Sequence, residues 1–223
     1  MIRTAAPGAE EASDRSSEGE LVAPERLIYF SDAVIAIALT LLALELPVPG
    51  GDVHGNAGVA HFVRAHLSEY AAFLISFCVV AMHWMFHQRL FRYARGLTGG
   101  TIRWNLLWLL AIVVMPFATK LLTSEADAFQ VQFAAYAAVQ VLAGVFLGQA
   151  FGSLRRPGLL RADLPPAAVA DTLTWISAVV VTFALSIPVA LVSRSASLSW
   201  MLLPVVRFAI GVVGRRRASR AGG

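Results

Sequence analysis

The sequence has little charge and a single cysteine. Only 14% of its 223 residues are Asp, Glu, Lys or Arg, whereas 57% are hydrophobic and the mean hydropathy is +0.67. These values lie outside the range of soluble globular domains and indicate an integral membrane protein. Because Cys78 has no second cysteine to pair with, an intrachain disulfide is excluded.

The sequence also lacks the marks of a nucleic-acid-binding protein or an enzyme. The net charge is +4 and the pI is near 9.8, but the basic residues flank apolar runs and do not form one patch. Orientation in a membrane explains them better, so we predict no nucleic-acid partner. We find no intramembrane pair of catalytic carboxylates, no metal motif and no Ser/His/Asp order, so we predict neither enzyme activity nor a cofactor.

Six apolar runs approach the length of about 20 residues that a helix needs to cross a bilayer. The sequence therefore predicts an all-α membrane protein with six transmembrane helices in a single domain at 24–214. A disordered cytosolic tail is expected at 1–23 and a basic cytosolic tail at 215–223. The predicted spans lie near 25–47, 69–91, 104–123, 129–151, 169–192 and 197–214.

Basic residues alternate between the two sides of these spans. Fourteen arginines fall on one side, and only Arg64, Lys120 and Arg194 fall on the other. The positive-inside rule then predicts that both termini lie in the cytosol. Arg207, inside the last run, is expected to extend its side chain toward the cytosolic interface.

The first run, RLIYFSDAVIAIALTLLALEL at 26–46, carries polar residues that an inert anchor would not need. Asp32 would lie about 12 Å from the start of a helix beginning at Pro24, given ~1.5 Å per residue. An ionised group there is costly in lipid, so Asp32 should face protein or water. Ser31 and Asp32 either form a structural network with neighbouring helices or bind a proton or cation. Glu45 either attracts cations at an outer mouth or is a solvated helix end.

His83 and His87 lie four residues apart and therefore share one face of the second predicted helix. This is also the spacing of paired zinc ligands, but the intervening residues lack the glutamate of an HExxH motif. We expect no metal and favour hydrogen-bonded packing. Arg89, Arg103 and Asn105 lie at a similar depth and are candidate partners for the polar residues of the first helix.

Ile37, Leu41 and Leu44 form an apolar stripe on one face of the first helix, with Thr40 at its border. The stripe is either ordinary packing or a hydrophobic pore constriction, which would need several copies of the helix around an axis. Leu39 is expected to lie on the lipid side.

Two segments resemble a known family. Arg26, Phe30, Ser31 and Asp32 form an Arg-x3-Phe-Ser-Asp motif near the start of the first helix. Residues 83–117 add His-Trp, His-x-Arg-x-Phe, Trp-Asn-Leu and Pro-Phe features. With these motifs, the first half of the chain resembles bacterial members of the endolysosomal potassium channel family, the transmembrane protein 175 family.

This resemblance implies a potassium-permeable channel in the cytoplasmic membrane of a prokaryote. It implies a homotetramer in which the first helices line the pore, without a TVGYG filter loop. Ile37, Leu41 and Leu44 would form the constriction, with Thr40 facing the pore. The residues implied for a structural polar network are Arg26, Phe30, Ser31, Asp32, His83, Trp84 and Asn105.

The chain departs from the family pattern at one place. Gly99 and Gly100 stand where we expect an acidic residue before the third helix, so the cytosolic end of the network should be partnered differently. The alternative to a channel is a proton- or cation-coupled secondary transporter, in which Asp32, His83 and His87 would titrate during transport.

Overall fold

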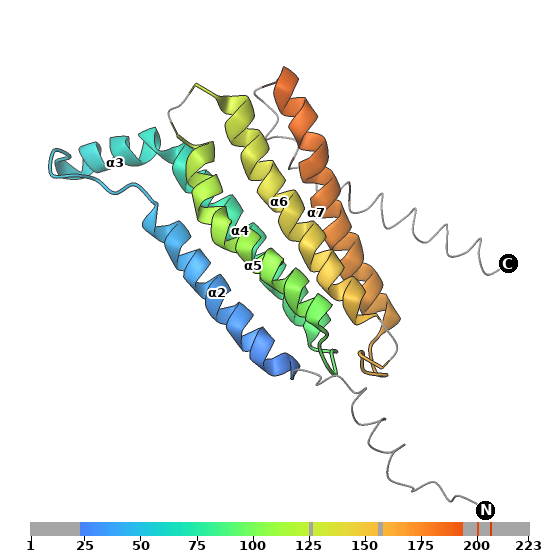
Figure 1. The fold of residues 1–223 in the computed structure, drawn as a ribbon. Helices are drawn as coiled ribbons and strands as arrows, with labels where there is room; N and C mark the ends of the chain where they lie inside the picture. Colours follow the sequence, from blue (N-terminus) through green and yellow to red (C-terminus); the bar gives the residue numbers. More distant parts are fainter. Residues whose placement is uncertain (1–22, 125–126, 156–157, 194–199, 201–205, 207–223) are drawn as a thin grey trace, which may run out of the picture.

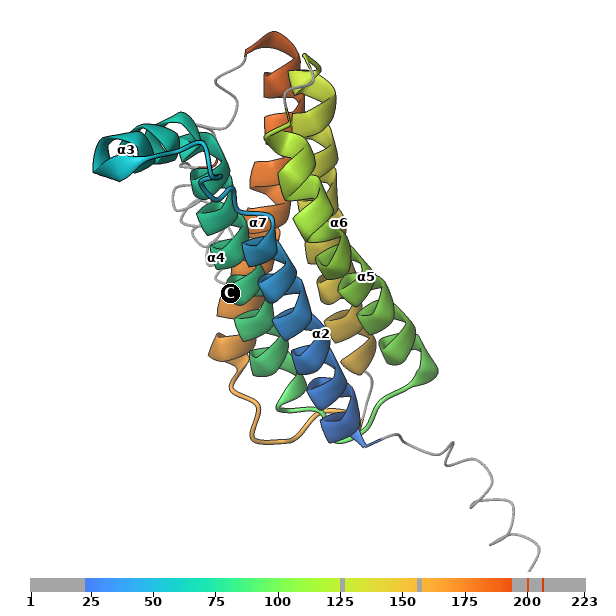
Figure 2. The same cartoon turned by 90° about the vertical axis from the view of Figure 1, so that its left-hand side faces the viewer.

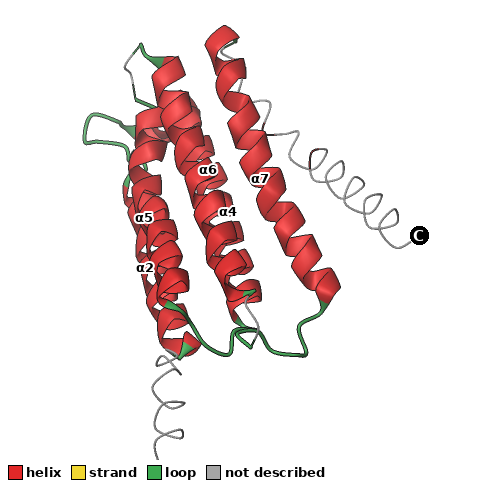
Figure 3. Cartoon of the chain, turned by 45° about the vertical axis from the view of Figure 1, so that its right-hand side comes forward, coloured by secondary structure: helices red, strands yellow, loops and turns green. Residues whose placement is uncertain are grey.

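A computed structural model describes residues 23–124, 127–155 and 158–193, together with Trp200 and Val206. Five long helices run side by side as a bundle, and a short helix lies across one end (Figure 1). Figure 3 shows the described loops between the helices. The helices are α2 (Pro24–Leu44), α3 (Gly55–Ala65), α4 (Leu67–Phe91), α5 (Gly99–Leu122), α6 (Phe129–Leu154) and α7 (Pro166–Val192).

The long helices α2, α4, α5, α6 and α7 are each long and apolar enough to cross a membrane. They match the first five predicted spans and confirm the prediction of an all-α membrane protein. The sixth predicted span, 197–214, lies outside the described residues except for Trp200 and Val206. The tails predicted at 1–23 and 215–223 also lie outside them, apart from Ala23.

Local chemistry explains where the helix boundaries differ from the prediction. Helix α5 begins earlier than expected because the Thr98 hydroxyl caps it, accepting a hydrogen bond from the Thr101 backbone N–H at 3.2 Å. Helix α2 ends at Leu44 because Pro47 disfavours helical geometry in the residue before it. Helix α7 begins at Pro166, whose missing N–H is not needed in a first turn.

Helix α3 lies in the connection between the first two predicted spans and was not predicted. It is too short to cross a membrane, and none of its residues is buried. Figure 1 places it across the end of the bundle where α2 finishes, projecting beyond α2. We call this end of the bundle the α3 end.

The opposite end of the bundle gathers arginines. Helices α2, α5 and α7 begin there, and α4 and α6 finish there (Figure 1). The α3 end, by contrast, carries Arg64 and Lys120. We call the first end the arginine-rich end, and its described arginines are Arg26, Arg89, Arg92, Arg95, Arg103, Arg155 and Arg161.

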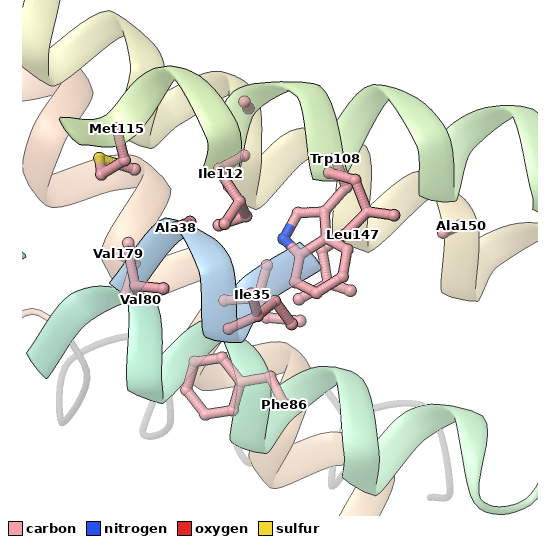
Figure 4. Packing of buried hydrophobic residues seen from close by; sticks show 14 of the residues in the cluster. Ile35, Ala38, Val80, Phe86, Trp108, Ile112, Met115, Leu147, Ala150 and Val179 are labelled. Atoms are coloured by element: carbon pink, nitrogen blue, oxygen red, sulfur yellow. The ribbon is translucent and has the colours of Figure 1, made fainter. Parts of the chain in front are cut away.

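The core is centred on α5, whose Trp108, Ile112 and Met115 are fully buried. Figure 4 shows them between residues of the neighbouring helices, including Ile35 from α2 and Leu147 from α6. Small residues let the helix backbones approach closely, as is typical of membrane bundles. Gly144 of α6 is the clearest case, because a Cβ atom there would overlap the Val180 side chain of α7.

Two loops at the arginine-rich end are joined by backbone hydrogen bonds. The Arg95 N–H donates to the Leu159 carbonyl, and the Arg161 N–H donates to the Tyr93 carbonyl, both at 2.8 Å. Ala94 and Leu160 thus form an isolated antiparallel bridge. The loop between α4 and α5 is therefore fastened to the loop between α6 and α7.

Candidate pore helix and its polar anchor

Helix α2 packs on one face only. Its buried residues Ser31, Ile35, Ala38 and Leu42 recur every three or four positions and therefore share a side of the helix. This side contacts α4 and α5, between which α2 lies in Figure 2. Helix α7 lies on the far side of the bundle from α2 (Figure 1). The remaining surface of α2 is consequently left largely uncovered by the residues that the structure describes.

The predicted stripe lies on this uncovered surface. Ile37 is 59% exposed, Leu41 42% and Leu44 80%. The stripe is therefore not part of the packed core. Leu39, expected on the lipid side, is instead partly buried and packs against the core. The expectation that Leu39 lies on the lipid side is therefore wrong.

Thr40 is exposed beside the stripe, and its hydroxyl is oriented by the helix. The hydroxyl donates to the Ile37 carbonyl at 2.7 Å. Because its only proton is used inside the helix, the oxygen lone pairs are left as acceptors. Thr40 therefore offers a hydrogen-bond acceptor, or a weak cation ligand, on an otherwise apolar surface.

Asp32 is anchored to α4 by two donors. Its Oδ1 atom accepts from the Trp84 indole N–H at 2.8 Å and from the Gln88 side-chain amide at 2.6 Å. Trp84 and Gln88 are one helical turn apart, so both reach the same carboxylate. Hydrogen bonds to an ionised group are stronger than neutral ones. They fix the first half of α2 against α4.

Ser31 is anchored to α5 through a buried chain of hydrogen bonds. Its hydroxyl donates to the Leu27 carbonyl at 2.8 Å and accepts from the Asn105 amide at 3.0 Å. The Asn105 carbonyl oxygen in turn lies 3.0 Å from Nε2 of His87. Since that oxygen can only accept, His87 carries its proton on Nε2 in this arrangement. One amide thus links α2, α4 and α5.

Aromatic stacking holds the two histidines. The His87 ring stacks on Trp108 with centroids 4.6 Å apart and on Phe91 at 4.3 Å. His83 is buried, and its Nδ1 accepts from the Trp108 indole N–H at 3.4 Å. Within the part of the chain that the structure describes, no group of three His, Cys, Asp or Glu side chains is arranged to hold a metal ion.

The structure brings together part of the predicted network. Ser31 bonds to Asn105 and Asp32 to Trp84, whereas His83 reaches Trp108 and not α2. Arg26 and Phe30 are exposed, and Arg26 makes no hydrogen bond or ion pair among the described residues. Two members of the observed network, Gln88 and Trp108, were not predicted from the sequence. The spacing of Gln88 from Trp84 could have indicated the former.

Hydroxyl groups replace the acidic residue expected near Gly99 and Gly100. Thr101 is buried, and its hydroxyl lies 2.7 Å from that of Ser153 on α6 and 3.0 Å from that of Thr98. Gly99 and Gly100 form the first residues of α5. The start of α5 is therefore held by neutral hydrogen bonds to α6.

Glu45, the candidate for cation attraction, already has a partner. Its carboxylate forms an ion pair with Lys120 near the end of α5, at 2.5 Å. Tyr70 of α4 donates to the Pro47 carbonyl at 2.8 Å, just beyond Glu45. The C-terminal end of α2, at the α3 end of the bundle, is thus attached to both α4 and α5. Lys120 also offsets the charge of Glu45.

The fold and this site define a multi-pass helical membrane protein built around a polar anchor on its first helix. The family described as "Endosomal/lysosomal potassium channel TMEM175" matches residues 26–116, which include most of α2, all of α3 and α4, and most of α5. A potassium channel of Streptomyces collinus is 34% identical over 148 residues, which are 64% of this chain and 71% of that protein. A potassium channel of Chamaesiphon minutus is 34% identical over 137 residues, or 61% of this chain and 63% of that protein.

The chain belongs to the TMEM175 family, which is a family of ion channels and not of enzymes. A crystal structure of a protein from Chamaesiphon minutus, described as a homologue of the lysosomal potassium-selective channel TMEM175, has the same fold. The TM-score is 0.66 at 23% identity, covering 85% of this chain and 96% of the other.

Proposed function

We propose that this protein is a potassium-permeable channel in which four copies of α2 surround the pore. The observation that carries the proposal is the division of α2 between two faces. Ser31 and Asp32 attach one side to α4 and α5, while Ile37, Leu41 and Leu44 remain exposed on another. In a tetramer, this exposed stripe would face the axis.

Stacked rings of these side chains would control ion conduction by determining whether water can fill the pore. Aliphatic groups provide no ligands to replace the hydration shell of an ion, so a narrow apolar ring blocks ions mainly by excluding water. Ions then pass when the ring widens or when they retain part of their shell. Potassium releases water more readily than sodium, so the barrier for potassium would be lower, giving modest selectivity.

Four Thr40 hydroxyls would add the polar part of this pathway. Each presents oxygen lone pairs because its proton is donated to the Ile37 carbonyl. Oxygen acceptors can replace part of the hydration shell of potassium, as carbonyl oxygens do in other filters. A ring of hydroxyls next to Ile37 and Leu41 would therefore strengthen the preference for potassium.

The polar anchor is better explained as scaffold than as a transport site. His83 and His87 are buried between α4 and α5, and His87 is enclosed by two aromatic rings. Asp32 is already bonded to two donors. Neither feature favours the alternative of a proton-coupled carrier. A carrier needs titrating groups that are accessible first from one side of the membrane and then from the other.

The arrangement of charge supports an orientation. Helix ends that carry predicted cytosolic arginines meet at the arginine-rich end, so we place this end, with both termini, in the cytosol of a prokaryote. A sixth span at 197–214 would return the chain to that side. In support, the Trp200 indole stacks on Phe133 with centroids 5.0 Å apart and donates to Ser186 at 3.2 Å.

The test is ion flux from liposomes that contain the purified full-length protein. Ile37→Asn and Leu41→Asn should hydrate the constriction, raise basal potassium flux and reduce discrimination against sodium. Leu185→Asn is the matched control, because Leu185 is 60% exposed on α7, across the bundle from α2. It introduces the same side chain at an exposed position outside the proposed pore and should leave flux unchanged.

Tetramer content is first equalised by gel filtration with mass determination. Single-channel current steps in planar bilayers support a pore, whereas flux that requires a gradient of a second ion supports a carrier. Unchanged flux and selectivity in both stripe variants would place the ion path elsewhere. A purified wild-type protein that is not tetrameric would contradict the assembly.

A further inference from the structure

A cavity of about 200 Å³ lies where the end of α4 meets the start of α7, at the arginine-rich end. Its basic lining comes from Arg89, in the last turn of α4, and from Arg92, which directly follows α4. Its apolar lining includes Leu90, Leu164 and Val169. The channel mechanism proposed above uses none of these residues, and the cavity lies away from the exposed stripe of α2.

The two guanidinium groups are suited to an anion with oxygen atoms. Arg89 and Arg92 are both exposed, and neither forms an ion pair among the described residues. Arg92 is held in place, with its guanidinium carbon 5.2 Å from the centre of the Tyr93 ring and a 3.3 Å hydrogen bond to the Tyr93 hydroxyl. Planar guanidinium groups bind phosphate through paired N–H donors.

Charge at this end of the bundle favours a negative ligand. Seven described arginines lie there, against the carboxylates of Glu25, Asp163 and Asp171. Asp163 is already near Arg161, at 3.7 Å. Asp171 lines the cavity together with the two arginines, so the cavity itself carries two positive charges and one negative charge. Its net charge is positive.

We propose that this cavity binds the phosphate headgroup of an anionic phospholipid from the leaflet at the arginine-rich end. The phosphate would meet Arg89 and Arg92, while the glycerol and upper acyl chains would lie along Leu90, Leu164 and Val169. Basic pockets between transmembrane helices at this depth are suited to such headgroups. The proposal does not depend on ion conduction.

The experiment measures lipid binding to the full-length protein in a neutral detergent. Native mass spectrometry counts bound lipid, and thermal unfolding reports stabilisation, because a ligand that binds only the folded state raises its Tm. The probes are phosphatidylglycerol, neutral phosphatidylcholine and soluble glycerol phosphate. Phosphatidylglycerol should bind and raise the Tm, whereas the other two should have little effect.

Matched variants locate the site. Arg89→Gln with Arg92→Gln should weaken phosphatidylglycerol binding about thirtyfold, because each arginine near an anionic membrane surface contributes about 1 kcal/mol. Arg103→Gln with Arg155→Gln removes the same charge from the same end but outside the cavity, and should retain wild-type binding. Asp171→Asn removes the negative charge of the cavity and should strengthen binding. Weaker binding in the Arg89/Arg92 variant together with stronger binding in Asp171→Asn would indicate a defined site, because a general loss of stability would weaken binding in both variants.

Three results would overturn the proposal. Equal loss of binding in the two double-arginine variants would indicate diffuse attraction to the whole end. Equal stabilisation by glycerol phosphate would indicate a site for soluble anions. Weaker or unchanged lipid binding in Asp171→Asn would show that the cavity is not involved, and it remains decisive if the Arg89/Arg92 variant fails to fold.

Discussion

The indole N–H of Trp84 on α4 donates to the carboxylate of Asp32 on α2 at 2.8 Å, across two helices that are far apart in the sequence. Gln88 supplies a second donor to the same oxygen atom at 2.6 Å. A membrane interior offers little water to replace either bond. The rotation of α2 is therefore set by a small number of polar contacts, and several consequences can be measured.

Asp32→Ala should destabilise the protein by about 1–3 kcal/mol, because it leaves the Trp84 and Gln88 donors without an acceptor. Trp84→Phe removes one donor and retains the Gln88 bond, so it should cost less. Thermal unfolding and gel filtration would report stability and tetramer recovery. A normal tetramer with altered ion selectivity in Asp32→Ala would mean that Asp32 takes part in conduction and not in the scaffold.

Thr40→Val keeps the shape of the side chain but removes its oxygen. If Thr40 faces the pore, potassium should lose its advantage over sodium, and the reversal potential in a potassium/sodium gradient should move toward zero. Assembly should not change, because the hydroxyl bonds only within α2 in the subunit. Thr40→Ser restores an oxygen and is the control; selectivity that follows side-chain volume and not the hydroxyl would contradict this role.

Lys120→Met should raise potassium conductance at low salt. The substitution leaves the Glu45 carboxylate unpaired at the outer end of α2, and four such charges would concentrate cations near the mouth. The gain should disappear near 1 M salt, where the Debye length is about 3 Å. Adding Glu45→Gln should also abolish the gain. A gain that persists in the double variant would require another cause.

Gly144→Ala should destabilise the packing of α6 against α7, because its Cβ would overlap the Val180 side chain. Gly148→Ala, one turn along the same helix, is the control: nothing lies within 4 Å of that added Cβ, and alanine favours helix by about 0.5–1 kcal/mol over glycine. Val180→Ala should restore stability to the Gly144 variant. Unfolding midpoints in detergent measure all three, and the absence of rescue would argue against the overlap.

The sequence predicts the five described spans well because their signal is the mean hydropathy of a long run, which does not depend on partners. It also predicts that Ser31, Asp32, Trp84 and Asn105 lie in one layer, because their depths follow from position along each helix. It does not predict that Gln88 bonds to Asp32, or that His83 bonds to Trp108 of α5 and not to α2. Which polar groups form hydrogen bonds depends on how each helix is rotated about its axis. A shift of one position along a helix turns the side chain by about 100° around that axis.

Two further features show what the sequence could and could not provide. Helix α3 is short, contains Gly55 and Gly58, and buries no residue, so neither hydropathy nor propensity identifies it. The Glu45–Lys120 pair could have been predicted from the sequence, because both residues fall at the same ends of predicted spans. The pairing was not predicted, because Glu45 was considered only as a cation-attracting group or a solvated helix end.

The bridge between the Tyr93–Arg95 and Leu159–Arg161 segments also determines where a reporter can be added to the protein. A fluorescent domain or an antibody epitope inserted beside Gly158 would have to accommodate a positive φ of 83° and would pull one side of the bridge from the other. Gly51 is exposed, and an added Cβ there would meet no atom within 4 Å. The connection before α3 is therefore the better place for a label with which to follow this protein in cells.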